Sequence, residues 1–239
     1  KLIEAAEQFR EAIRLKPLLA EPHNNLGMVL LRQGANADAL REFQEASRLN
    51  AELTEVQGNL CQALFALGRF DEGAAACDAA LRRQPDSPDV RYAIALAHFR
   101  RGRVDEAIGQ LRESVRIRPD FAQARNDLAI ALLTKGQVSE ALVQLQETVR
   151  LQPDNTDALF NLANTLQQIG RPAEAVPHYE RALASRPDDF AIRTNLGTAL
   201  LAINRVAESL VQFQAALRLK PDSLQARENL ARAQARRGR

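Results

Sequence analysis

The sequence predicts an all-α protein in which a pair of helices recurs every 34 residues. Two observations carry this prediction. The good helix formers Ala, Leu, Arg, Glu and Gln dominate the composition, and prolines and glycines recur at a constant spacing. The prolines are Pro17, Pro85, Pro119, Pro153, Pro187 and Pro221. The glycines are Gly34, Gly68, Gly102, Gly136, Gly170 and Gly238, and the gap in their series is filled by Asn204, because Asn tolerates a left-handed backbone best after glycine.

Each period reads as two helices separated by a turn. With the proline numbered as position 32 of the repeat, helix A spans about positions 1 to 14 and helix B about positions 17 to 30. The glycine at position 15 ends helix A, and the proline ends helix B because it cannot continue a helix. Small residues at positions 8, 20 and 27 let the two helices approach closely, and large residues at positions 7, 11, 24 and 28 fill the space between them.

This numbering gives six full repeats, which we expect to form a single solenoid of 14 helices over residues 1–239. Repeats 1 to 6 span residues 20–53, 54–87, 88–121, 122–155, 156–189 and 190–223. Residues 1–19 supply a helix B before them, and residues 224–239 supply a helix A after them. The chain starts and stops inside repeat units, and its first helix carries the core-like stripe Ile3, Ala6, Phe9 and Ile13, so we expect a segment of a longer protein.

The pattern resembles the tetratricopeptide repeat family, whose 34-residue signature has Leu and Gly at positions 7 and 8, Ala at 20 and 27, an aromatic residue at 24 and Pro at 32. Repeat 1 carries Leu26, Gly27, Ala39, Phe43 and Ala46, and repeat 6 carries Leu196, Gly197, Phe213, Ala216 and Pro221. The resemblance implies a right-handed α-α superhelix whose A helices line a concave groove. The sequence departs from the family pattern at position 4, which is usually Trp. The residues at that position are His23, Gln57, Arg91, Arg125, Leu159, Arg193 and Arg227.

Composition and charge exclude several classes of protein. The formal net charge of +2, from 32 basic and 30 acidic residues, argues against a dedicated nucleic-acid or membrane-surface protein. No apolar run approaches the roughly 20 residues of a membrane-spanning helix. The first residues lack the apolar stretch of a signal peptide, which favours the cytoplasm, but a targeting segment could have been cut away and the compartment stays open.

No cluster of reactive side chains stands out. His23, His98 and His178 lie in separate repeats, and the sequence has no glycine-rich phosphate loop or nucleophile elbow, so we expect no catalytic site, no cofactor and no metal. Cys61 and Cys77 occupy positions 8 and 24 of repeat 2, both facing the interior between helices A and B. We expect two reduced, inaccessible thiols there, with a redox pair as the alternative.

Position 6 of helix A carries asparagine in five of seven units, although Asn is a poor residue inside a helix. We call these residues the Asn ladder: Asn25, Asn59, Asn161, Asn195 and Asn229. An amide offers both donors and an acceptor, which suits the backbone of an extended peptide. The Asn-Leu-Gly and Asn-Leu-Ala triplets resemble the superhelix of O-linked N-acetylglucosamine transferase, which implies this role. The alternative is that the amides hydrogen-bond the neighbouring helix and fix the stacking.

Apolar groove positions concentrate where the ladder is interrupted by Ala93 and Asp127. These residues are Tyr92, Leu96, Phe99, Ile130 and Leu133. They predict a central apolar patch flanked by amide-rich stretches, unless neighbouring A helices bury them against each other. Acidic residues at position 2, such as Glu21, Glu55 and Asp89, argue against a clamp for acidic peptide C-termini.

The sequence therefore predicts a protein-interaction scaffold that holds an extended or amphipathic peptide in its groove. Two alternatives stay open. The chain could be the substrate-recruiting arm of a larger enzyme such as a glycosyltransferase, or it could assemble with itself through its ends or grooves.

Overall fold

The computed structural model describes residues 2–237, and this part of the chain folds into 14 α-helices and no strand. The prediction of an all-α helical repeat is confirmed, with the expected number of helices. The helices are α1 (Leu2–Leu15), α2 (Ala20–Arg32), α3 (Asn36–Leu49), α4 (Thr54–Ala66), α5 (Phe70–Arg83), α6 (Pro88–Arg100), α7 (Val104–Ile117), α8 (Ala122–Thr134), α9 (Val138–Leu151), α10 (Thr156–Gln168), α11 (Pro172–Ser185), α12 (Phe190–Ala202), α13 (Val206–Leu219) and α14 (Leu224–Arg237).

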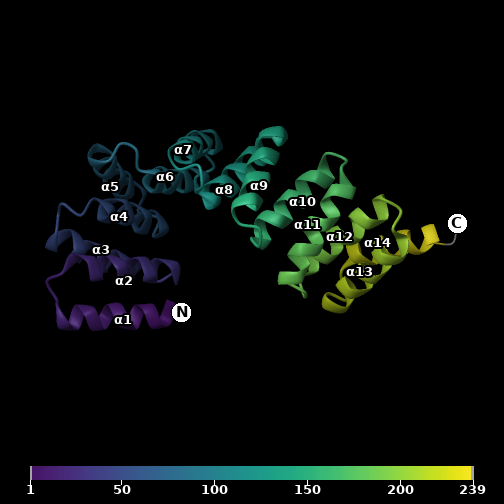
Figure 1. Cartoon of the computed structure of the whole chain (residues 1–239), viewed down its shortest axis with the longest axis horizontal. Coiled ribbons are helices and arrows are strands. Elements are labelled where there is room, and N and C mark those ends of the chain that lie inside the picture. The colour runs from purple at the N-terminus through teal and green to yellow at the C-terminus, as the bar shows by residue number, and fades with distance from the viewer. Residues whose placement is uncertain (1, 238–239) are drawn as a thin grey trace. The chain divides into compact units, whose positions relative to one another are not determined.

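The chain divides into two compact units, Lys1–Ala124 and Arg125–Arg239. In the first unit, helices α2, α4 and α6 are A helices, and each packs against the B helix that follows it, α3, α5 and α7 (Figure 1). In the second unit, α10 and α12 pack in the same way against α11 and α13 (Figure 1). Successive A helices within a unit also pack on one another, as α4 does on α6. Each unit is thus a stack of helix pairs, and the single solenoid over residues 1–239 stays a prediction.

The turn after each A helix has the same hydrogen-bonded form, which explains the glycine series. Gly34 has φ +79°, and the amide of Ala35 donates back to the carbonyl of Leu30 at 2.9 Å. This is the Schellman arrangement, which needs a left-handed residue just after the helix. Asn204 has φ 64° and makes the equivalent turn, so its place in the glycine series is confirmed. Gly238 lies outside the described residues.

Arginine at position 4 connects helix A to the preceding turn and to helix B of its own repeat. Arg193 Nε donates to the carbonyl oxygen of Pro187 at 2.8 Å, and Arg193 Nη1 donates to Gln212 Oε1 at 3.0 Å. Arg91 makes the equivalent pair of bonds in repeat 3. Hydrogen bonds at this position therefore bridge helix A, helix B and the turn, where a Trp would do so by packing.

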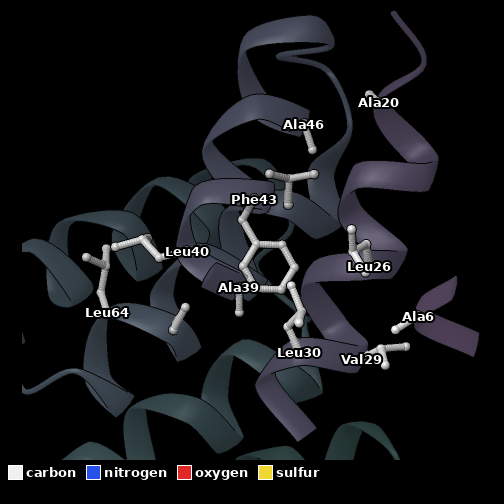
Figure 2. Packing of buried hydrophobic residues seen from close by; sticks show 12 residues of the cluster. Ala6, Ala20, Leu26, Val29, Leu30, Ala39, Leu40, Phe43, Ala46 and Leu64 are labelled. Carbon is white, nitrogen blue, oxygen red and sulfur yellow. The ribbon is translucent and has the colours of Figure 1, made fainter. Parts of the chain in front are cut away.

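A phenylalanine at position 24 fills the core between helices A and B in repeats 1 and 6. Figure 2 shows Phe43 between α2 and α3, beside Leu26 and Leu30. Its side chain has no exposed surface. A Cβ atom added to Gly27 would lie 2.6 Å from the Phe43 ring, so the ring occupies the space that a side chain at position 8 would need. Gly197 and Phe213 meet in the same way in repeat 6.

Repeat 2 has a cysteine at each of these two positions, and the structure joins them in a disulfide. The Cα atoms of Cys61 and Cys77 are 5.1 Å apart, within the usual range for this bond. The prediction of two reduced thiols was therefore wrong, although both residues are buried as expected. The reason is the packing just described: positions 8 and 24 touch across the helix pair, and two small side chains there bring their sulfur atoms together.

None of the helices between residues 2 and 237 combines the length and the apolar character that crossing a bilayer requires.

Candidate functional site

A groove of about 860 Å³ runs along the A helices of the first unit. Its lining comes mainly from repeat positions 2, 5, 6, 9 and 12, which are the positions on the open side of helix A. The lining includes Met28 and Leu31 of α2, Asn59 and Gln62 of α4, Tyr92 of α6, and Phe121. The lining therefore contains both amide and apolar side chains, which suits a ligand with a polar backbone and apolar side chains.

The groove contains two of the predicted site residues, Asn59 and Tyr92. Three others belong to the first unit but do not line the groove: Asn25, Leu96 and Phe99. The remaining five belong to the second unit: Ile130, Leu133, Asn161, Asn195 and Asn229. Most of the ten are half-buried, and Phe99 is the most open of the apolar five, at 37% exposed. The predicted central patch is thus divided between the two units.

One end of the groove is an aromatic pair held by an arginine. The rings of Tyr92 and Phe121 have centroids 5.0 Å apart, and the guanidinium carbon of Arg118 lies 3.6 Å from the centroid of Phe121. Arg118 also donates two hydrogen bonds to the carboxylate of Asp89, at 2.8 and 3.1 Å. Such a cation–π contact favours a fixed ring position. Tyr92, Phe121 and Arg118 thus form one chain of contacts in this part of the groove.

Phe121 is not among the predicted site residues, although the sequence carries a signal for it. Phe121 stands at position 34, directly before helix A. At that position Ser87, Asn155 and Asp189 accept a hydrogen bond from an amide in the first turn of the following helix. Leu19 and Leu53 also stand at this position without capping the next helix, but Phe121 is the aromatic residue among them, and it lines the groove.

The acidic residues at position 2 are partly neutralised within their own repeats. Asp89 is paired with Arg118 in repeat 3, and Asp157 with Arg186 at 2.8 Å in repeat 5. Glu55 lies on the groove wall and is exposed. Of these carboxylates, Glu55 and Asp89 line the groove, together with the cation Arg32.

Three members of the Asn ladder donate hydrogen bonds to an asparagine on the preceding A helix. The Nδ2 atom of Asn59 lies 2.7 Å from Asn24 Oδ1, and Asn161 and Asn195 make equivalent bonds of 3.3 and 2.8 Å to Asn126 and Asn164. Asn24 is only 3% exposed and Asn126 7%, so these two acceptors are buried amides, whereas Asn164 is half-buried. Hydrogen bonds of this kind, between neighbouring A helices, are what the stacking alternative for the Asn ladder predicts. The Oδ1 atoms of Asn59 and Asn161 take no part in them.

In the second unit, this stacking network extends into the core through a tyrosine. Tyr179 Oη donates to Asn164 Oδ1 at 2.6 Å, the same oxygen that accepts from Asn195. Burial raises the pKa of the Tyr179 hydroxyl well above its usual range, so it stays protonated and remains a donor. Asn164, at position 9, thus joins two A helices and one B helix.

We expect Asn59→Ala to lower the free energy of unfolding by about 1–3 kcal/mol, because it leaves the buried amide oxygen of Asn24 without its donor. Asn25→Ala is the matched control, since Asn25 makes no side-chain hydrogen bond to any residue between 2 and 237. Its change should stay within about 0.5 kcal/mol. Urea denaturation followed by circular dichroism measures both, and equal losses would contradict a stacking role for Asn59.

The helix pairs, their repeated turns and the groove along the A helices define a helical-repeat scaffold. A sequence profile of the tetratricopeptide repeat matches residues 4–52, 59–122, 126–190, 160–213 and 194–239. The chain belongs to the tetratricopeptide repeat family. Proteins of this family are in general non-catalytic scaffolds that bind proteins or peptides.

Solved structures with this fold are similar to the chain at low sequence identity. The Cut9–Hcn1 hetero-tetramer of the APC/C aligns with a TM-score of 0.72 and 16% identity, over 98% of this chain and 46% of that one. PilF of Pseudomonas aeruginosa gives a TM-score of 0.76 at 15% identity, over 89% and 97%. YrrB, described as having an unusual peptide-binding site, gives 0.53 at 21% identity, over 79% and 97%. These likenesses establish the fold alone, and the comparison with curated sequences found no match.

Proposed function

We propose that the first unit binds an extended protein segment in its groove and acts as a non-catalytic interaction scaffold. The observation that carries this proposal is the lining itself, in which the amides of Asn59 and Gln62 lie beside the apolar side chains of Met28, Leu31 and Tyr92. A peptide backbone needs hydrogen-bonding partners whatever its sequence, and apolar pockets beside it supply preference for particular side chains.

In this proposal the Asn ladder has two functions. The Nδ2 group of Asn59 holds the neighbouring helix, and its Oδ1 atom accepts a backbone amide of the ligand. Asn25 does not line the groove, and it has no hydrogen bond to another described side chain, so its whole amide would serve a ligand that extends past the groove. Asn161, Asn195 and Asn229 would serve the second unit in the same way, and the apolar residues Leu96, Phe99, Ile130 and Leu133 would add side-chain contacts within their own units.

Tyr92 should be the main anchor in the first unit, because its ring packs against Phe121 and lines the groove. Buried aromatic anchors commonly cost about 2 kcal/mol or more on truncation, which is a weakening of roughly thirtyfold. We therefore expect Tyr92→Ala to weaken peptides selected from a random display library by roughly that factor.

Isothermal titration of several selected peptides against the whole chain tests this expectation. The control is Val211→Ala, which removes an exposed apolar side chain (56% exposed) of the second unit and should leave affinity unchanged. Circular dichroism establishes that both variants stay folded. A folded Tyr92→Ala protein that binds these peptides as tightly as the original would overturn the groove as their site.

A further inference from the structure

A second cavity, of about 220 Å³, opens between α5 and α6 and shares no lining residue with the groove. Its walls are apolar, formed by Phe65, Phe70, Ala74, Cys77, Ile94 and Ala97. Its rim carries Asp78, His98, Arg101 and Arg103. The cavity thus combines an apolar interior with a charged opening, and the peptide groove makes no use of it.

Comparison among the repeats explains why the cavity exists here. In the other five full repeats, positions 21 and 24 both carry large apolar or aromatic residues. They are Leu40 with Phe43, Ile108 with Leu111, Leu142 with Leu145, Val176 with Tyr179, and Leu210 with Phe213. Repeat 2 has Ala74 and Cys77 instead. The space is therefore what remains when two large side chains are replaced by small ones.

The neighbouring aromatic residues fill this space only in part. Phe65 turns toward Gly73, where an added Cβ atom would lie 2.5 Å from its ring, and it contacts Phe70 with ring centroids 6.1 Å apart. Ala74 stays exposed at the opening, whereas Leu40 and Leu210 at the same position are buried. Apolar cavities of about 150 Å³ can bind benzene, so this one has room for an aromatic ring and a short substituent.

The charges at the opening favour an acidic substituent. The guanidinium carbon of Arg101 lies 5.0 Å from the centroid of Phe70, and neither Arg101 nor Arg103 forms an ion pair with another residue between 2 and 237. Burial and these two arginines lower the pKa of His98, and Glu106 opposes them. The lining thus carries two guanidinium groups without an ion-pair partner and one carboxylate, that of Asp78.

We propose that the cavity between α5 and α6 binds a small aromatic carboxylate of the arylacetate class. The ring lies among Phe65, Phe70 and Ile94, in the space that Leu and Phe side chains fill in other repeats. The carboxylate reaches the guanidinium groups of Arg101 and Arg103, which are suited to planar acids.

Titration of the whole chain with phenylacetate, followed by amide chemical shifts in two-dimensional NMR, tests the proposal. We expect saturable shifts at residues of α5 and α6, with a Kd of about 1 mM or tighter, as the small number of ligand atoms allows. Phenethylamine, a cation of similar size, should bind at least about tenfold more weakly. Absence of saturable shifts, or equal binding of the amine, would overturn the assignment.

Two substitutions that restore a large side chain make the test specific. Ala74→Leu and Ala74→Val introduce the residues that repeats 1 and 5 have, Leu40 and Val176, and should weaken phenylacetate at least about tenfold while the melting temperature holds or rises. Ala75→Leu, on the same helix and outside the cavity lining, is the matched control and should leave binding unchanged. Undiminished binding by a folded Ala74 variant would contradict the site, and all three variants should bind groove peptides normally.

Discussion

Replacing Phe43 by alanine is expected to lower the free energy of unfolding of the first unit by about 3–5 kcal/mol, because the ring is fully buried and the surrounding helices can close the cavity only in part. The ring fits against the bare backbone of Gly27, so its removal leaves a cavity between α2 and α3. The loss should appear as a shift of the urea midpoint in the circular dichroism signal.

Phe99→Ala provides the control for Phe43→Ala, because it deletes the same side chain at a site that is 37% exposed. Its effect should be several times smaller, since much of that ring already contacts water. Hydrogen exchange measured by NMR would locate the destabilisation of Phe43→Ala in α2 and α3. Similar losses in the two variants would mean that the core is not organised around position 24.

Reduction of the Cys61–Cys77 disulfide is expected to cost about 3 kcal/mol of stability. The two cysteines are 16 residues apart in sequence, and in the chain-entropy account closing a loop of about 15 residues removes that much freedom from the unfolded state. Denaturation with and without dithiothreitol measures the difference.

The double variant Cys61→Ala/Cys77→Ala is the control, because its stability should not respond to the reductant. A thiol count gives an independent check: the original chain, unfolded without reductant, should contain no thiol that reacts with Ellman's reagent. Two reactive thiols in that experiment would show that the bond does not form.

Features set within one repeat could be predicted from the sequence. The helix boundaries follow from glycine and proline, and the left-handed residue at Asn204 follows from the turn that every repeat needs. The burial of Phe43 and Phe213 follows from position 24 lying between helices A and B. Each of these depends on residues close in sequence, which the 34-residue period makes visible.

Features that depend on contacts between helices were harder to foresee. The sequence placed Asn59 on the open side of helix A, but its bond to Asn24 depends on the register of two successive A helices. The pairing of Cys61 with Cys77 depends on a Cα distance of 5.1 Å that the pattern left open. The cavity beside Ala74 could have been suspected by comparing position 21 across the repeats, but its volume depends on how far Phe65 and Phe70 move into it.

The disulfide within repeat 2 also changes how the chain responds to mechanical tension. When a protein is pulled from its ends, each unfolded residue adds at most about 3.3–3.6 Å of length. The segment between Cys61 and Cys77 cannot extend while the bond is intact. The two cysteines are 16 residues apart, so the fully stretched chain is shorter by roughly 50 Å than it would be without the bond. In a reducing environment the stretched chain gains that length within repeat 2 alone, and the other repeats are unchanged.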